Sequence, residues 1–389
     1  MSGLIVKPRS RIYHGHDWVY SSEILKSFGE PKDGDIVTLK TPSDQLLGSG
    51  MYNSKSTIVA RRFSRQRQEL DLDFFERRIA IAIEYRRRYG VNERLGRIVW
   101  SESDGMPGLI VDQYGDYLVV QTVTLAMDQR RELITEALQR AVKPRGIIER
   151  NDTMVRLAEG LELRTGMLAG DAPEPFVVDA AGIKIEVDLL KGQKTGFYLD
   201  QIGNYAPVAA LAKGKRVLDC FSNGGGFALA SAQAGAREVI AIEISADCVR
   251  SIKRNAELNK VNVEAYAANV FDVLKDFERQ NQRFDLIVLD PPSFTKTKGK
   301  LTEARRGYKE IHLRALRLLA PDGILATFCC SHHVTSQFFR EVIIEAAVDA
   351  KKTLRQLALF TQGIDHPIIP TLPETEYLKG FMFDLVPGR

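Results

Sequence analysis

The fold is decided by residues 216–236, which read RVLDCFSNGGGFALASAQAGA. The apolar run 216–220 predicts a strand, a glycine-rich turn follows, and an apolar helix begins near Phe227. Glycines at such a turn let the backbone approach a ligand closely and expose the N–H groups of the helix N-terminus. A tight turn without a ligand is the alternative interpretation. The segment therefore predicts an α/β fold with a candidate ligand site after this strand.

Downstream, predicted strands and helices alternate. Further strands are predicted at VIAIEIS (239–245), VEAYAAN (263–269), FDLIVLD (284–290) and ILATFCC (324–330), and helices at 245–260 and about 302–320. This alternation predicts a parallel sheet with helices on both faces, whose ligands gather at the C-terminal ends of the strands.

The glycine-rich turn does not fit a dinucleotide site. The fingerprint G-x-G-x-x-G requires glycine at position 229, where this chain has Leu229. Glu243, at the end of the next strand, instead suits a nucleoside, because one carboxylate can accept both ribose hydroxyls. An NAD-dependent oxidoreductase is therefore disfavoured.

Two motifs follow later strands at the same expected rim. Asp290-Pro291-Pro292-Ser293-Phe294 is a stiffened turn, in which the prolines hold Asp290 at the rim and Phe294 can stack on a planar base. A rigid loop with a capping aspartate is the alternative.

The second motif is Cys329-Cys330-Ser331-His332-His333. Because side chains alternate along a strand, at most one of the two thiols faces the cleft, and the other is an inert core residue. The two histidines are interpreted as loop residues that hydrogen-bond to backbone.

The first 70 residues have a different character. They predict short strands between turns and end in a basic stretch that contains Arg61, Arg62, Arg65 and Arg67. They also carry the whole net charge of +4, which points weakly to a polyanionic partner.

The segment after residue 70 has a mixed pattern. An amphipathic helix is predicted from Asp73, two strands flank the Tyr-Gly-Asp turn at 114–116, and a helix is predicted over about 128–142.

The composition excludes fibrous, collagenous, disordered and membrane proteins. The chain has 389 residues, 44% of them hydrophobic and 27% charged, which suits two or three soluble domains. No apolar run reaches the ~18 residues of a membrane span, and the first residues contain no apolar segment of signal-peptide type, so a cytoplasmic location is expected. Four cysteines, two of them adjacent, favour neither disulfides nor a zinc site, and no metal is expected.

Taken together, these motifs resemble the bacterial large-subunit rRNA (cytosine-C5)-methyltransferases, a class I S-adenosyl-L-methionine-dependent family. The resemblance rests on KTGFYLDQ (194–201), LDCFSNGGGF, DPPSF and CCSHH in this order, and it covers almost the whole chain. It implies a PUA-like RNA-binding domain (1–70), an α+β connecting domain (71–188) and a Rossmann-like methyltransferase domain with a mostly parallel seven-stranded sheet (189–389). The implied partner is RNA, the expected substrate large-subunit rRNA. No membrane partner is expected, and a homodimer is compatible with the family.

The resemblance also assigns roles to individual residues. Cys330 would be the catalytic thiol, and Asp290 would assist it and border the cofactor. The cofactor site would be formed by Phe197, Asp200, Gln201, Asp219, Ser222, Asn223, Gly224, Gly226, Glu243, Asn269 and Val270. The substrate would be bound by Pro291, Pro292, Ser293, Phe294, Arg61 and Arg62. Many relatives have aspartate at the position of Asn269, so this chain departs from the common pattern there.

These residue types suit methylation of a pyrimidine. A thiolate that adds to C6 of cytosine makes C5 electron-rich, so that C5 attacks the sulfonium methyl. A free thiol has a pKa of about 8.5, so Cys330 needs activation. The target base must leave its stack to reach the pocket, and the basic N-terminal segment would grip RNA.

Other activities remain open at this point. The same thiol chemistry serves C5 of uridine, and an Asp-Pro-Pro turn can also contact a guanine amine during N2-methylation, which needs no thiol. A catalytically silent RNA-binding protein is the alternative from another class.

Overall fold

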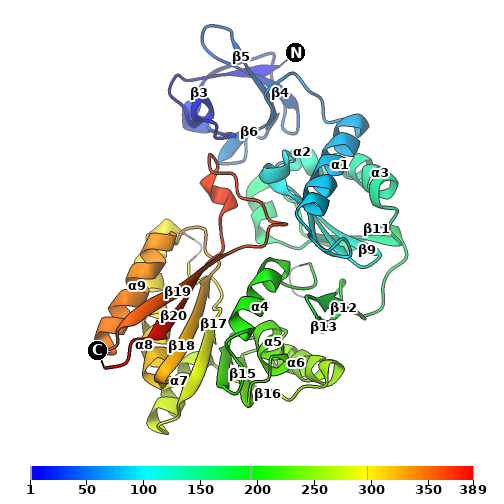
Figure 1. Ribbon diagram of the computed structural model, residues 1–389. Coiled ribbons are helices and arrows are strands. Elements are labelled where there is room, and N and C mark those ends of the chain that lie inside the picture. Colours follow the sequence, from blue (N-terminus) through cyan, green and yellow to red (C-terminus); the bar gives the residue numbers. More distant parts are fainter. Residues whose placement is uncertain (1, 193–194, 296, 389) are drawn as a thin grey trace. The chain divides into compact units, whose positions relative to one another are not determined.

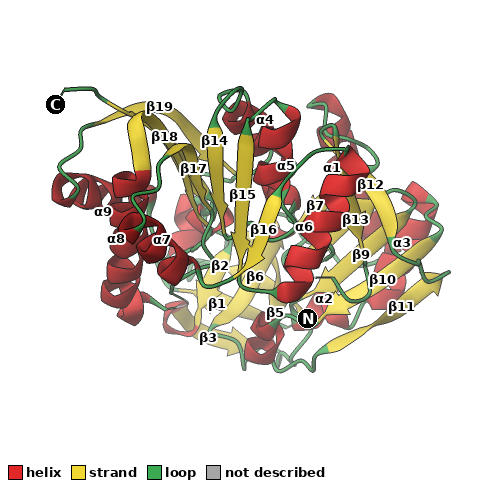
Figure 2. Cartoon of the chain, turned by 90° about the horizontal axis from the view of Figure 1, so that it is seen from below, coloured by secondary structure: helices red, strands yellow, loops and turns green. Residues whose placement is uncertain are grey.

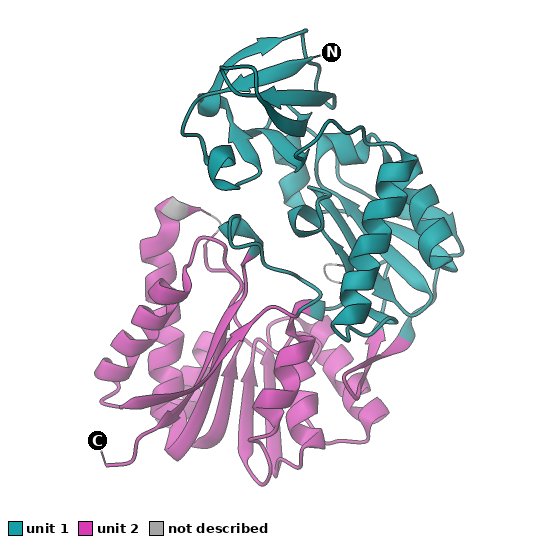
Figure 3. Ribbon diagram, turned by 45° about the horizontal axis from the view of Figure 1, so that its top comes forward, with its two compact units in different colours: residues 1–176, 187–199, 364–375 teal, residues 177–186, 200–363, 376–389 magenta. Residues whose placement is uncertain are grey.

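The computed structural model describes residues 2–192, 195–295 and 297–388, so Lys194 of the KTGFYLDQ motif lies outside the described residues. The described residues divide into two compact units (Figure 3). Unit 1 comprises residues 1–176, 187–199 and 364–375, and unit 2 comprises 177–186, 200–363 and 376–389.

Unit 1 begins with a β-rich module, as the turn-rich N-terminal sequence predicts. Its described strands form a six-stranded sheet in the order β2-β6-β5-β4-β1-β3 around a small apolar core that includes Leu4, Val19 and Leu39. The strands are β1 (Gly3–Val6), β2 (Trp18–Tyr20), β3 (Ile24–Phe28), β4 (Ile36–Lys40), β5 (Leu46–Tyr52) and β6 (Ile58–Ser64).

The second module of unit 1 is an α+β layer. Within the described residues its sheet has the order β11-β10-β9-β8-β7, and α1 packs beside α3 (Figure 1). The elements are α1 (Leu72–Arg88), β7 (Leu95–Trp100), β8 (Leu109–Tyr114), β9 (Tyr117–Thr122), α2 (Leu125–Asp128), α3 (Arg131–Val142), β10 (Gly146–Asn151) and β11 (Arg164–Gly170). The helix predicted from Asp73 is confirmed, and it begins one residue earlier, at Leu72. Asp71 caps it by accepting a hydrogen bond from the N–H of Phe74, and Phe75 and Ile79 are buried in the core.

Unit 2 contains the predicted α/β sheet. Its described strands run in the order β16-β15-β14-β17-β18-β20-β19, with β20 antiparallel to both neighbours and the first five strands parallel. They are β14 (Arg216–Cys220), β15 (Glu238–Glu243), β16 (Glu264–Ala267), β17 (Phe284–Leu289), β18 (Leu319–Cys329), β19 (Leu354–Thr361) and β20 (Lys379–Leu385). The expected mostly parallel seven-stranded sheet is confirmed.

Helices cover both faces of this sheet. In Figures 1 and 2, α7, α8 and α9 lie on one face and α4, α5 and α6 on the other. The helices are α4 (Ile202–Ala209), α5 (Gly226–Gln233), α6 (Ala246–Asn259), α7 (Val270–Arg279), α8 (Leu301–Leu318) and α9 (Ser336–Asp349). The central strands are buried on both sides, which explains their continuous apolar sequence. None of the described helices has both the length and the apolarity to cross a bilayer.

A short hairpin, β12 (Phe176–Ala180) with β13 (Ile183–Val187), joins the two units in sequence. Most of its residues belong to unit 2, because Asn255 and Asn259 of α6 accept hydrogen bonds from the N–H groups of Glu186 and Lys184. The three-domain division drawn from the sequence stays a proposal.

Candidate active site

The candidate site lies where the strand order of unit 2 reverses. Going along the chain, β14, β15 and β16 run toward one edge of the sheet, and β17 returns to the other side of β14. Such a reversal opens a crevice at the carboxyl ends of the strands. Asp219, near the end of β14, and Asp290, directly after β17, both face this region, and the N–H of Asp290 donates to the carbonyl of Cys220 at 3.3 Å.

The glycine-rich turn after β14 has a left-handed backbone conformation at every second residue from Phe221 to Gly225. Phe221, Asn223 and Gly225 have φ values of 63°, 49° and 87°, so every second residue is left-handed. Left-handed non-glycine residues are uncommon and gather at functional sites. Asp219 helps to hold the turn, because its carbonyl accepts a hydrogen bond from the Ser222 hydroxyl at 2.8 Å.

The carboxyl group of Asp219 is buried, and its pKa is raised. Burial raises its pKa to about 7, and the negative charge of Asp290 adds to the effect, while hydrogen bonds from Ser222 and the Ala228 N–H oppose it. Oδ2 accepts the Ala228 N–H at 3.1 Å. Within the described part of the chain, Oδ1 is buried without a hydrogen-bond partner. A buried carboxylate oxygen of this kind is suited to a cationic or hydrogen-bond-donating ligand.

Glu243, at the end of β15, is held toward the same turn. Its carboxylate accepts the N–H of Asn223 at 3.0 Å through Oε2 and the N–H of Ser245 at 3.1 Å through Oε1. Each carboxylate oxygen has two lone pairs, so both remain able to accept a further hydrogen bond. This is the geometry expected of a residue that binds a diol.

The structure gives two glycines of the turn a packing role. A Cβ on Gly226 would lie 2.3 Å from Cζ of Tyr205, and one on Gly225 would lie 3.2 Å from Cγ1 of Ile252. Glycine at 226 is therefore required for the approach of the Tyr205 ring, which the sequence pattern did not reveal.

Asn269 follows β16, where an adenine contact is expected. Its side-chain oxygen accepts the N–H of Phe271 at 2.9 Å and caps α7, and Val270 beside it is buried. The departure from aspartate at this position thus coincides with an ordinary N-cap, a role that asparagine fills well. The adenine contact stays a prediction.

Asp290 is joined to the start of α4. Its Oδ2 accepts a hydrogen bond from Nε2 of Gln201 at 2.9 Å, and Oε1 of Gln201 in turn accepts from Asn204 at 2.7 Å. Next to Gln201, Asp200 accepts the Tyr377 hydroxyl at 2.7 Å. The structure therefore brings Asp200, Gln201, Asp219 and Asp290 to one rim, although they are far apart in sequence.

The two adjacent thiols point in different directions. Sγ of Cys330 lies 3.9 Å from the carbonyl oxygen of Pro291, in the Asp-Pro-Pro turn, and the residue is partly exposed. Cys329 is fully buried, and its Sγ lies 3.2 Å from the hydroxyl of Tyr308 in α8. Burial also raises the pKa of Cys329. The expected division into one rim thiol and one core thiol agrees with these positions.

The rest of the Asp-Pro-Pro-Ser-Phe turn is largely occupied by internal contacts. The Phe294 ring packs 4.6 Å from the Tyr308 ring and contacts the main core of unit 2, while the Ser293 hydroxyl donates to the carbonyl of Thr295 at 2.6 Å. Pro291 is buried and Pro292 is exposed. Stacking of Phe294 on a base therefore competes with an existing aromatic contact.

Lys379 is a residue of this region that sequence analysis missed. It is 5% exposed, and its ammonium donates to the carbonyls of Ser331 and Val334 at 2.8 and 2.9 Å, which anchors the loop after Cys330. Burial lowers the pKa of Lys379, and attraction to Cys329, Glu376 and Cys330 opposes this shift. This contact arises because Lys379 of β20 pairs with Cys329 of β18. No pattern in the sequence predicts that pairing.

Three predicted site residues lie in unit 1. The side chain of Arg62 is 6% exposed and ion-paired to Asp17 at 2.7 Å, and Arg61 is paired to Glu102 at 2.9 Å and to Glu159 at 3.4 Å. Phe197 is buried, and its N–H donates to the Tyr114 hydroxyl at 3.1 Å. The two arginines thus have internal counter-ions, and the roles of all three residues stay predictions.

Comparison with known proteins places these features in a family context. Residues 161–367 match a family described as S-adenosylmethionine-dependent methyltransferase, and residues 5–65 match a PUA-like domain. The protein named ribosomal RNA large subunit methyltransferase I from Aeromonas salmonicida (strain A449) is 40% identical and covers 97% of this chain and 98% of its own. The protein of the same name from Tolumonas auensis (strain DSM 9187 / NBRC 110442 / TA 4) is 39% identical, with 94% of each chain covered.

Solved structures agree with the fold. A protein described as a methyltransferase and complexed with SAH has a TM-score of 0.86 at 22% identity, with 99% of this chain and 100% of that chain covered. A protein from Streptococcus mutans described as a SAM-dependent methyltransferase has a TM-score of 0.84 at the same identity and coverage.

Proposed function

The chain belongs to the S-adenosylmethionine-dependent methyltransferase family, and from that premise we propose that it methylates C5 of a cytidine in large-subunit ribosomal RNA through a covalent adduct of Cys330. Its cofactor is S-adenosyl-L-methionine. The relatives that match over nearly their whole length are named for large-subunit rRNA, and the N-terminal PUA-like module supports an RNA substrate.

The residues of the rim suit this cofactor. When bound, S-adenosylmethionine supplies an electrophilic methyl group on a sulfonium, and it also carries an ammonium and a ribose diol. The buried Oδ1 of Asp219 suits a cationic or donating group, and Glu243 suits the diol. The carboxylates of Asp219, Glu243 and Asp290 together favour a positively charged ligand in this crevice.

In the proposed reaction, the thiolate of Cys330 adds to C6 of the cytosine ring and forms a C–S bond. This addition moves the electron pair of the C5–C6 double bond onto C5, which becomes the nucleophile toward the methyl group that the bound cofactor would supply, and the cofactor's sulfur would keep the electrons of the methyl–sulfur bond. A base removes the C5 proton, the double bond re-forms and the thiolate is expelled. Asp290, held by Gln201, faces N3 of the ring and, in its acid form, donates a hydrogen bond as the thiol adds.

The observation that carries the proposal is the position of Cys330. Its Sγ lies 3.9 Å from the carbonyl of Pro291, directly after Asp290, whereas the neighbouring thiol is buried against Tyr308. A nucleophile and a carboxyl group are thus brought together at the carboxyl ends of β17 and β18, the edge of the sheet where ligands of this fold bind.

The test traps the adduct. RNA that carries 5-fluorocytidine cannot lose its C5 substituent as a proton, so a Cys330 enzyme should form a complex that survives a denaturing gel in the presence of the cofactor. Cys330→Ala should abolish both the trapped complex and methyl transfer. Cys329→Ala, the matched control, should retain both.

The outcomes separate the alternatives. Trapping with 5-fluorouridine RNA alone would indicate uridine-C5 methylation. Full turnover by Cys330→Ala would exclude the thiol mechanism and favour methylation of a guanine amine. A protein that binds RNA but does not bind the cofactor in calorimetry would be a silent RNA-binding protein.

A further inference from the structure

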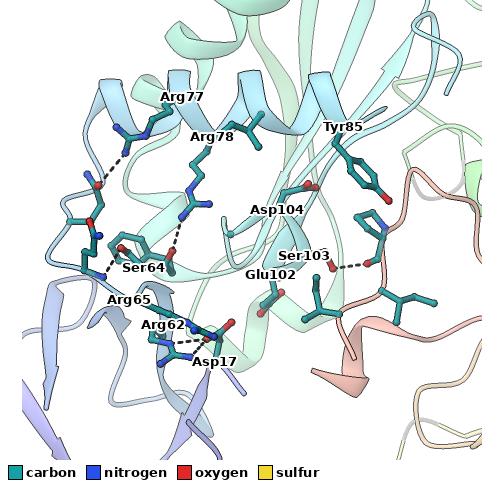
Figure 4. A pocket seen from close by; sticks show the side chains of 18 residues that line it. Asp17, Arg62, Ser64, Arg65, Arg77, Arg78, Tyr85, Glu102, Ser103 and Asp104 are labelled. Atoms are coloured by element: carbon teal, nitrogen blue, oxygen red, sulfur yellow. Dashed lines mark hydrogen bonds and ion pairs between the residues drawn. The ribbon is translucent and has the colours of Figure 1, made fainter. Parts of the chain in front are cut away.

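Unit 1 contains a pocket that the proposed reaction does not use. It has a volume of about 900 Å³ and lies between the end of β6, one side of α1, the turn 101–105 and the segment 367–369, all within unit 1 (Figure 4). This volume lies within the ~300–1,000 Å³ typical of small-molecule sites. We call it the β6–α1 pocket.

The acidic groups that line the pocket are neutralised from within the protein. Asp17 is paired with Arg62 at 2.7 Å, and Asp104 is paired with Arg86 at 2.6 Å. Glu102 accepts hydrogen bonds from Arg61 and from Trp18, both at 2.9 Å. These carboxylates therefore offer little attraction to a cationic ligand.

Two basic groups of the lining are also ion-paired, Arg62 with Asp17 and Arg77 with Asp73, but the other two, Arg78 and Arg65, differ. Arg78 is half-buried and donates to the carbonyl of Phe63 at 3.3 Å, and among the residues that the structure describes it forms no ion pair. Burial lowers the pKa of Arg78 and the positive charge of Arg77 lowers it further, while attraction to the Asp104 carboxylate opposes this shift. Arg65 is exposed and has no ion pair within the same described ranges. A half-buried guanidinium without a counter-ion is costly, and an anion in the pocket would relieve that cost.

The opposite part of the lining is apolar and aromatic. Tyr85 reaches into the pocket from the same helix as Arg78 (Figure 4), and Ile81, 57% exposed, lies one turn before it. Ile368 and Ile369 complete this side. A planar, partly apolar group can pack here while its negative charge faces the arginines.

We propose that the β6–α1 pocket binds a segment of single-stranded RNA, with phosphate on Arg78 and Arg65 and a base against Tyr85. A nucleotide combines an anion with a flat ring, which matches both parts of the lining. The inference rests on the proposed function in one respect, namely that RNA is the substrate. It assigns RNA contact to Arg65 and Arg78, whereas Arg61 and Arg62 are held by internal carboxylates.

The test measures binding of a fluorescein-labelled single-stranded RNA of 12 nucleotides by anisotropy over a range of salt concentrations. Arg78→Gln and Arg65→Gln should each weaken binding roughly tenfold, and each should reduce the slope of log K against log salt by about 0.7, the value for one lost phosphate contact on a single strand. Arg87→Gln is the matched control, because it removes the same charge from the same helix at an exposed site paired with Glu93. An effect of Arg87→Gln equal to that of Arg78→Gln would overturn the proposal.

Two further measurements complete the design. Tyr85→Ala should weaken binding of RNA but not of inorganic polyphosphate; equal weakening of both, or of neither, would overturn the base contact. If Arg78→Gln lowers the melting temperature, its weaker RNA binding could come from a less stable fold. Arg65→Gln, at an exposed position, then provides the test of the phosphate contact. In methylation assays, the arginine variants should raise KM for RNA and leave kcat and cofactor binding unchanged. Retained methyl transfer in Cys330→Ala would overturn the proposed reaction but would leave the RNA affinities of the arginine variants unaffected, so the two proposals can fail separately.

Discussion

Asp219→Asn offers a quantitative test of the electrostatics of the rim. Burial raises the pKa of Asp219 to about 7, from 3.8 in an exposed setting. A carboxyl group whose pKa is raised in the folded state contributes stability that is present below the unfolded pKa and is lost as the pH rises through the folded pKa. The difference between these two pKa values corresponds to a loss of about 4 kcal/mol of unfolding free energy once Asp219 is ionised in the folded protein, above about pH 7.

Asparagine removes the ionisation and keeps the shape of the side chain. The difference in unfolding free energy between Asp219→Asn and the unaltered protein should therefore grow in favour of the variant by about 2.5 kcal/mol from pH 5 to pH 8. Urea denaturation of cofactor-free protein at several pH values measures this difference. If the asparagine amide is left unpaired, its cost is the same at every pH. It therefore shifts the stability difference by a constant amount and does not change how that difference depends on pH. Asp322→Asn, at an exposed position of β18, is the control and should give no slope.

The same group should respond to the cofactor. A positively charged ligand favours the carboxylate and lowers its pKa, so binding should release protons near pH 7 and become tighter as the pH rises through 7. Calorimetry in buffers of different ionisation enthalpy counts these protons. A stability difference that is constant between pH 5 and pH 9 would refute the reasoning, since it would mean that Asp219 does not titrate there.

Three further variants probe neighbouring contacts. Cys329→Ala should lower the unfolding free energy by about 1–2 kcal/mol in urea denaturation, because it removes the contact with the Tyr308 hydroxyl; unchanged stability would contradict the buried position. Asn269→Ala should lower the unfolding free energy by about 1 kcal/mol, because the N-cap of α7 is lost. Calorimetry should show weaker cofactor binding by this variant only if Asn269 also contacts the adenine. Lys379→Met should lower the melting temperature and move the pH profile of methyl transfer to higher pH, since the loop of Cys330 loses its anchor and a nearby positive charge; an unshifted profile would limit Lys379 to a structural role.

The sequence predicted the parts of the site that depend on local pattern. Strand β14, the turn after it and strand β17 follow from short apolar runs bounded by glycine and proline, and the strands were found at the predicted residues. The divergence of Cys329 and Cys330 follows from the two-residue period of a strand. Roles for individual residues came from the family resemblance, which requires the motifs to occur together.

Contacts between distant residues were decided only by the tertiary structure. Nothing in the basic run at 61–67 distinguishes Arg61 and Arg62, whose counter-ions are Glu102, Glu159 and Asp17, from Arg65, which has no ion pair in the described ranges. Likewise, Lys379 reaches the loop of Cys330 through antiparallel pairing of β20 with β18. Periodicity reports which face of an element is buried, whereas a salt bridge or a pocket depends on which elements become neighbours. That choice follows from the packing of the whole core, so it is absent from any short stretch of sequence.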